Sequence, residues 1–144
     1  MRIVYDTNIL VLSQIGNPAL AILQAAFTDA TEKPLAFYYS EAMLTEYTNT
    51  LTKLTRERFD LFDPVDINEL LEQVKRYGHL VHPTITLTGN PDACSHEPDN
   101  RFLECAITTE ADYIITVNTV HFPTIYQGIK VIGPTQFSHI LFSD

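Results

Sequence analysis

Arg2-Ile3-Val4-Tyr5-Asp6-Thr7-Asn8 is the stretch that decides the fold, because a short apolar run ends there abruptly in a carboxylate. Such a run near the start of a chain is typical of a buried strand. In open α/β sheets, ligands bind beyond the carboxyl ends of the strands, so Asp6 is placed for chemistry. Asp is also a common turn residue that bonds its own backbone after a strand. The segment alone leaves both interpretations open.

Composition predicts one globular domain over residues 1–144, since 45% of the 144 residues are apolar. The chain has neither an apolar run of ~18 residues, which a bilayer span needs, nor a signal-peptide pattern. We therefore expect a cytoplasmic protein without membrane contact. The net charge of −9 argues against broad electrostatic attraction to nucleic acid. A nucleic-acid substrate is still compatible with that charge, because bound divalent cations would reverse the local field.

Helical and strand patterns alternate along the chain. Ser40 and Asp63 are favoured N-caps, and Asn17-Pro18 is typical of a cap followed by proline at the first helical position. The strands are apolar on both faces, which favours a parallel sheet covered by helices on both sides. We therefore predict a three-layer α/β fold. Its helices are expected at residues 19–27, 41–56, 64–78, 99–110 and 138–142, and its strands at residues 2–5, 35–39, 79–82, 113–117 and 129–132.

Two further acids can converge on Asp6. Glu46 projects about 100° from the centre of its helix's apolar stripe, at the border of the buried face. Asp99 lies on the apolar face of the helix that it opens. The alternatives are a solvated helix glutamate and an N-cap aspartate, although a carboxylate has two oxygens and can fill two roles. Glu104 is interpreted as flanking, and Asp112, at the opposite sheet edge, as structural.

Asn118 follows the strand predicted at residues 113–117 and therefore lies at the same sheet edge as Asp6. It is either a turn residue or a neutral oxygen ligand. Hard oxygen ligands around one point suit Mg²⁺ or Mn²⁺, which lower the pKa of bound water and stabilise charge on a phosphoryl group. Zinc is disfavoured, because Cys94 and Cys105 are not accompanied by a second ligand pair and are interpreted as free thiols.

Four segments, in this order and at these separations, resemble the PIN-domain family, and within it the VapC-like toxins of bacterial and archaeal toxin–antitoxin pairs. The segments are Val4–Leu10, Ser40–Glu46, Asp99–Ala106 and Ala111–Asn118, and the resemblance covers approximately residues 2–123. It implies a parallel sheet flanked by helices. It also implies an Mg²⁺- or Mn²⁺-dependent endoribonuclease that leaves a 5′-phosphate and a 3′-hydroxyl.

The resemblance also implies roles for individual residues. Asp6, Glu46 and Asp99 match the family's characteristic acids, with Asp6 and Asp99 as the principal metal ligands. Glu46 would bind metal or orient the attacking water. The side chains that match supporting positions are Thr7, Asn8 and Thr116.

The chain departs from the family pattern at the fourth acidic position, where Asn118 replaces a carboxylate. Asn118 would hold a water or the scissile phosphate, and the lost charge should weaken binding of a second ion most. His121 stands where another acid is often seen; it would contact a phosphate, or it is a loop histidine with no such role.

Three cations, Lys53, Arg56 and Arg58, cluster near the end of the helix that carries Glu46. They would guide RNA or contact a partner's acids; the alternative is a solvated helix end that complements the helix dipole. The partners expected from the resemblance are RNA, a small antitoxin protein and a second copy of the chain. The alternative function is a PIN-fold binding module with a weakened metal site. A phosphotransferase with an aspartyl nucleophile is disfavoured, because Asn8 stands where that chemistry usually has an acid.

Overall fold

The computed structural model describes residues 1–28 and 34–143. Within them, one sheet has the strand order β3-β2-β1-β4-β6-β5. The strands are β1 (Arg2–Tyr5), β2 (Ala36–Ser40), β3 (His79–Val81), β4 (Tyr113–Ile115), β5 (Ile125–Tyr126) and β6 (Ile129–Ile132). The helices are α1 (Thr7–Ser13), α2 (Ala19–Ala26), α3 (Glu41–Glu57), α4 (Pro64–Tyr77), α5 (Asn100–Thr109) and α6 (Pro134–Phe142), with the 3₁₀ turns η1 (Glu97–Asp99) and η2 (Thr119–His121).

The sheet is parallel except at one edge. Strands β3, β2, β1, β4 and β6 pair in parallel, as the sequence predicts, whereas β5 pairs antiparallel with β6. Gln127 and Gly128 join β5 to β6, and both have positive φ, at 51° and 85°. A two-residue hairpin turn favours this geometry. The sequence does not predict β5, because two residues are too few to show a strand period.

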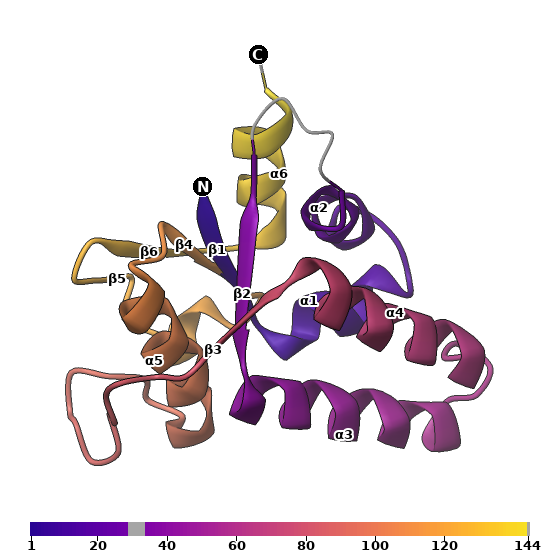
Figure 1. The fold of residues 1–144 in the computed structure, drawn as a ribbon, viewed down its shortest axis with the longest axis horizontal. Helices are drawn as coiled ribbons and strands as arrows, with labels where there is room; N and C mark the ends of the chain where they lie inside the picture. The colour runs from indigo at the N-terminus through magenta and orange to yellow at the C-terminus, as the bar shows by residue number, and fades with distance from the viewer. Residues whose placement is uncertain (29–33, 144) are drawn as a thin grey trace.

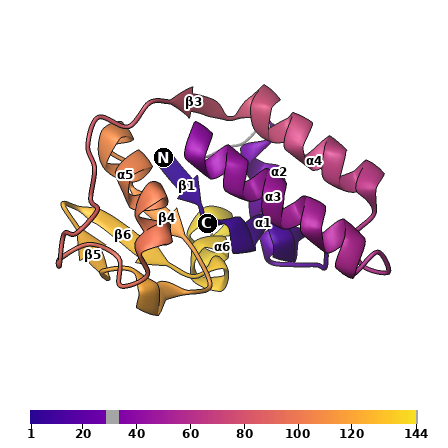
Figure 2. The same cartoon turned by 90° about the horizontal axis from the view of Figure 1, so that it is seen from below.

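The helices lie on both sides of the sheet, which confirms the predicted three-layer α/β fold. Helix α5 lies on one side, and α1, α2 and α4 lie on the other (Figures 1 and 2). Tyr5, at the end of the central strand β1, is fully buried and joins the sheet to its helical cover. Its hydroxyl donates to the Ile22 carbonyl at 2.7 Å, and its ring lies 5.3 Å from that of Phe37 and 6.4 Å from that of Phe137.

The predicted caps position two of the helices. The Ser40 hydroxyl accepts from the Met43 amide at the start of α3, and Asp63 accepts from the Val65 amide at the start of α4. At α2 the prediction is one residue early, because Pro18 occupies the cap position. Asn17 still contributes, since its side-chain oxygen accepts from the amide of Ala21 at 3.1 Å.

Helix α1 is the main element that the sequence patterns do not predict. Asp6 caps it and turns the chain directly from β1 into the helix, so Thr7 and Asn8 are the first helical residues and not a turn. This connection places three consecutive polar side chains at the carboxyl end of the central strand. Among the described helices, none combines the length and the hydropathy needed to cross a membrane.

Candidate functional site: an acidic cluster at the carboxyl end of the sheet

Asp6 serves both as a turn residue and as a buried carboxylate of the site. Its Oδ1 accepts from the Thr7 amide at 2.7 Å, which caps α1. Its Oδ2 accepts from the Thr116 hydroxyl at 2.7 Å and from the Asn8 side-chain amide at 3.2 Å. Thr116 reaches Asp6 because β1 and β4 pair in parallel, with Tyr5 opposite Ile115, so both strands end together.

The charge around Asp6 shows that the other two acids lie near it. Burial raises the pKa of Asp6 from 3.8 to about 6, and the charges of Asp99 and Glu46 also raise it. The hydrogen bonds from the Thr116 hydroxyl and the Thr7 amide oppose this rise. The three carboxylates therefore share one negative potential beyond the carboxyl end of the sheet. A bound cation would relieve that repulsion.

Glu46 faces the cluster from α3, at the border of the buried face, as predicted. Its side chain is 24% exposed, and its Oε2 accepts from the Thr7 hydroxyl. The adjacent Tyr47 is fully buried and donates from its hydroxyl to the Tyr5 carbonyl. This bond joins α3 to the end of β1, so Glu46 is held close to Asp6 from the side of the neighbouring helix.

Asp99 reaches the cluster from the start of α5, but it does not cap that helix with its side chain. The expected capping bond is absent, because Asp99 ends the 3₁₀ turn η1 and its main chain has helical geometry. Its Oδ2 lies 3.1 Å from Nδ1 of His121, on the turn that follows β4. The carboxylate is thus directed toward the end of the sheet, at 9% exposure for the residue.

Asn8, Thr116 and Asn118 form a polar chain along the same edge. Asn8 donates to the Thr116 hydroxyl at 3.3 Å and accepts from the Val117 amide at 3.3 Å. The backbone amide of Asn118 donates to the Thr116 hydroxyl at 3.0 Å. The side chain of Asn118 makes no capping bond, and the residue is exposed. The structure thus brings Thr7, Asn8 and Thr116 into contact with the predicted acids, and it leaves Asn118 at the rim.

The three predicted substrate-binding cations lie apart from the acids. Helix α3 extends away from α5, so its last turns are distant from Asp99 (Figures 1 and 2). Arg56 lies ten residues beyond Glu46 on α3, which corresponds to about 15 Å along a helix. Two of the cations pair locally: Lys53 lies 3.8 Å from Glu57, and Arg58 lies 3.2 Å from Asp60.

Arg101 is a residue of the site that no sequence pattern marks. Its Nη1 lies 3.9 Å from Oε1 of Glu46, so a guanidinium borders the acidic cluster. In the sequence, Arg101 is a single cation two residues after Asp99 in an acidic chain. Two residues correspond to about 200° around a helix, which makes Arg101 look like a solvated residue of the opposite face.

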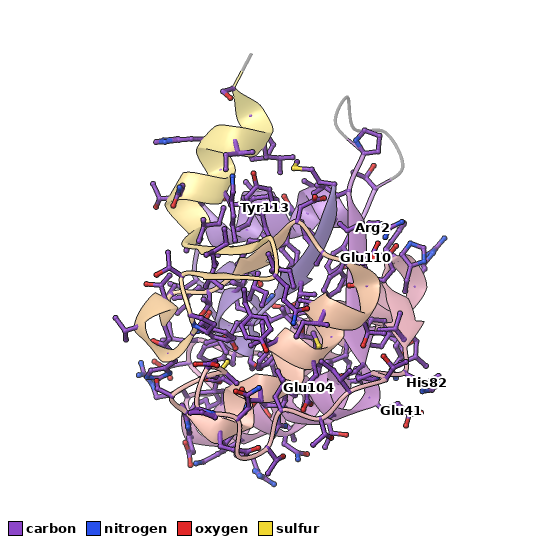
Figure 3. All side chains as sticks on the ribbon, turned by 90° about the vertical axis from the view of Figure 1, so that its left-hand side faces the viewer. Arg2, Glu41, His82, Glu104, Glu110 and Tyr113 are labelled. Carbon is purple, nitrogen blue, oxygen red and sulfur yellow. The ribbon has the colours of Figure 1, made fainter. Side chains whose placement is uncertain are left out.

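Asp112, interpreted as structural, and Glu104, interpreted as flanking, both have structural contacts. Asp112 accepts from the Arg2 amide at 2.8 Å, at the sheet edge opposite to Asp6. Arg2 also pairs with Glu110 at 4.0 Å, and the two side chains lie near each other in Figure 3. Glu104 accepts from the Leu87 amide at 2.7 Å and thereby anchors the loop before α5.

Among the described residues, no three side chains of His, Cys, Asp or Glu form a ready-made metal cluster. Mg²⁺ does not need one, because it commonly keeps several waters and binds one or two carboxylates. The hard oxygen atoms of Asp6, Asp99 and Glu46 fit that chemistry. Cys94 and Cys105 do not, because burial raises the pKa of both thiols to about 12 and keeps them protonated.

One cavity of the molecule lies away from this site. A cavity of about 420 Å³ lies between α1, α2 and α4 and is lined by Gln14, Leu23, Phe27 and Asp66 among others, but by none of the three acids. We identify the candidate site from the convergence of charge at the end of the sheet, where parallel α/β folds bind ligands.

Comparison with known proteins identifies the family of this fold. The PIN-domain family model matches residues 2–120. The chain is also similar to a chain in the crystal structure of VapBC2 from Rickettsia felis bound to a DNA fragment from their promoter, with 13% identity and a TM-score of 0.58. That match covers 91% of this chain and 98% of the other, and at this identity it shows the fold alone. No curated protein matches the chain. Because the family model spans most of the sequence, the chain belongs to the PIN-domain family.

Proposed function

We propose that this chain is a divalent-metal-dependent endoribonuclease that hydrolyses RNA phosphodiester bonds. PIN domains are generally nucleases that use divalent metals. The observation that carries the proposal is the convergence of Asp6, Glu46 and Asp99 at the carboxyl end of the sheet: Thr7 bonds both Asp6 and Glu46, and the charges of Asp99 and Glu46 add to the effect of burial in raising the pKa of Asp6. Capping of α1 needs only Asp6, so it does not explain why Glu46 and Asp99 lie beside that carboxylate; a cation that binds a phosphodiester does.

Each residue of the site has an assigned role in this proposal. Asp6 and Asp99 would hold Mg²⁺ or Mn²⁺, which supplies an activated water and stabilises charge on the phosphoryl group. Thr116, Asn8 and the Thr7 amide fix both oxygens of Asp6 by hydrogen bonds.

Glu46 and Asn118 would act on the attacking water and the substrate. Glu46, held by the Thr7 hydroxyl, would bind metal or orient the attacking water. The exposed Asn118 would hold a water or the scissile phosphate, and His121 would keep Asp99 directed into the site.

The test is cleavage of structured and unstructured RNA with Mg²⁺ or Mn²⁺ by the wild type and by Asp6→Asn. We expect the variant to lose at least 100-fold in rate, because removing a principal ligand weakens the ion that drives hydrolysis. Asp112→Asn is a matched control, since the same change is then made at the opposite sheet edge. It should keep nearly full activity.

Two outcomes would contradict the nuclease proposal. One is the absence of cleavage of every RNA by the wild type, together with no effect of metal on its Tm. The other is activity that persists unchanged in Asp6→Asn, which would indicate a contaminating nuclease.

We infer that the chain is the toxin of a toxin–antitoxin pair and acts in the cytoplasm as a homodimer. The support for the pair is the PIN family together with the similar fold of a chain in the VapBC2 structure. A short, charged protein encoded beside this chain should copurify with it after co-expression and suppress RNA cleavage. An isolated reading frame, with no copurifying protein, would count against the pair.

A second function is favoured by one observation, the asparagine at position 118. A PIN fold that binds metal weakly could act as a binding module through protein–protein contacts. Asn118→Asp separates the two functions, because it restores the family's carboxylate at an exposed rim position. If the wild type is inactive and Asn118→Asp gains a large Mg²⁺-dependent cleavage activity, the natural chain is a binding module. If the wild type is active and Asn118→Asp changes its activity only modestly, the chain is a nuclease.

A further inference from the structure

Arg101 forms an ion pair with the acidic cluster but no direct hydrogen bond to it. Its side chain is 31% exposed, and Nη1 lies 3.9 Å from Oε1 of Glu46, beyond hydrogen-bonding distance. The other oxygen of Glu46 accepts from Thr7. Glu46 is therefore anchored on the side of Asp6, and its other oxygen forms a loose ion pair with Arg101.

The backbone holds the guanidinium independently of Glu46. Nε of Arg101 donates to the Pro98 carbonyl at 2.7 Å, and Nη1 donates to the Ala42 carbonyl at 3.4 Å. These carbonyls belong to the turn before α5 and to the first turn of α3, so the cation is fixed where the two elements meet. Within the described residues, Nη2 forms no hydrogen bond.

The outer side of Arg101 opens onto two hollows. One, of about 380 Å³, is also lined by Thr45, Thr86 and Thr88, and the other, of about 260 Å³, by Glu41 and His82. Glu104 lines both hollows, and it lies on the same face of the molecule as Glu41 and His82 (Figure 3). A chain of nucleotides thus has an open approach to Arg101 from solvent.

Two of the three acids that line these hollows accept hydrogen bonds, whereas the third, Glu41, is exposed. Glu104 accepts from the Leu87 amide at 2.7 Å, and Glu97 accepts from the Thr88 hydroxyl at 3.2 Å. Neither carboxylate forms an ion pair with Arg101 in the described part of the chain. The ion pair with Glu46 involves Nη1 at 3.9 Å, and Nη2 forms no hydrogen bond within the described residues, so the guanidinium keeps a donor for an anion that approaches from the hollows.

Other described cations are placed less well for this task. Lys53, Arg58 and Lys75 pair with acids outside the cluster, whereas Arg101 pairs with Glu46 of the cluster. Arg76 lies 5.5 Å above the ring of Tyr77 on α4. In a chain with a net charge of −9, a fixed cation beside the acids decides where an RNA backbone can come close.

We propose that Arg101 is a substrate-binding residue that contacts an RNA phosphate next to the scissile bond, with the neighbouring nucleotide in the Thr-lined hollow. This inference rests on the proposed nuclease function and adds to it the side from which RNA enters. It assigns to Arg101 the task that the sequence suggested for Lys53, Arg56 and Arg58. A planar guanidinium fixed by backbone carbonyls suits phosphate oxygens, because little side-chain freedom is lost on binding.

The test measures binding of a fluorescein-labelled single-stranded RNA, with Mg²⁺ and across a range of salt, in an Asp6→Asn background that blocks cleavage. Arg101→Gln should weaken binding about tenfold or more at low salt, the size expected for one charged hydrogen-bonded contact. It should also reduce the slope of log K against log salt by about 0.7, the value for one phosphate contact to a single strand. Arg76→Gln is the matched control, because it removes the same charge from α4 and should leave both quantities unchanged.

Arg101→Lys distinguishes a phosphate contact from a purely structural role of Arg101. A lysine keeps the charge without the planar fork, so it should restore the salt slope while regaining only part of the affinity. If Arg101→Gln lowers the Tm but leaves the salt slope unchanged, Arg101 is structural and the inference is overturned. It is also overturned if Arg101→Gln binds RNA like its parent while the wild type cleaves RNA, an outcome that leaves the nuclease proposal standing. A wild type that neither binds nor cleaves RNA overturns both.

Discussion

Asp6 links the stability of the protein to pH. Its pKa in the folded state, about 6, lies above the ordinary value of 3.8, because burial and the charges of Asp99 and Glu46 disfavour the carboxylate. Between these two values the folded protein binds more protons than the unfolded chain, so stability falls as the pH rises through this window. Above pH 6 the full penalty is about 3 kcal/mol, at about 1.4 kcal/mol per pKa unit.

The prediction is that Asp6→Asn stabilises the metal-free protein at neutral pH. An amide has no charge to bury and still offers one oxygen and one donor to Thr7 and Thr116. In thermal melts with a chelator, the variant should melt higher than the wild type at pH 8, and the difference should vanish near pH 4. An equal difference at both pH values would show that the effect does not come from the buried charge.

At the scale of elements, Gly78 controls how α4 leads into β3. It is the C-cap of α4, and a Cβ atom at this position would lie 2.5 Å from the Val74 carbonyl oxygen and 2.8 Å from the Tyr39 ring. Because Tyr39 is buried in β2, neither neighbour can move away freely. We predict that Gly78→Ala lowers the free energy of unfolding by about 1–3 kcal/mol, the usual cost of overpacking.

Urea denaturation measures this change, and Gly16→Ala is its control. A Cβ atom at Gly16, in the connection between α1 and α2, would meet no atom within 4 Å. That variant should be neutral or slightly stabilising, since alanine restricts the unfolded chain. Equal midpoints for the two variants would refute the packing argument at Gly78.

At the scale of the whole molecule, Mg²⁺ should stabilise the folded state by binding it and not the unfolded chain. A ligand present at 100 times its Kd contributes about 2.7 kcal/mol, which raises the Tm by several degrees in a domain of this size. Protons compete with the metal at Asp6, whose pKa is about 6. The rise should therefore be larger at pH 7.5 than at pH 5.5.

Variants at the two edges of the sheet test this response. Asp6→Asn should abolish the rise in Tm with Mg²⁺, whereas Asp112→Asn, at the opposite edge, should keep it. A rise that survives in Asp6→Asn would place the metal elsewhere in the molecule.

Most of the fold could be predicted from the sequence, because the spacing of apolar residues within a short segment distinguishes a helix from a strand. The boundaries of α3 and α4 follow from Ser40 and Asp63, whose side chains cap those helices in the structure. Helix α1 and strand β5 were not predictable in this way. The first is seven residues long and begins with polar residues, and the second has only two residues.

The sequence by itself determined the parallel arrangement and the identity of the candidate acids, since apolar runs that end in polar residues mark the carboxyl edge of such a sheet. Only the tertiary structure decided what those acids contact. Thr116 meets Asp6, His121 meets Asp99, and Arg101 lies beside Glu46. These pairs are separated by 110, 22 and 55 residues, and their contacts depend on strand pairing and helix packing that no local pattern encodes.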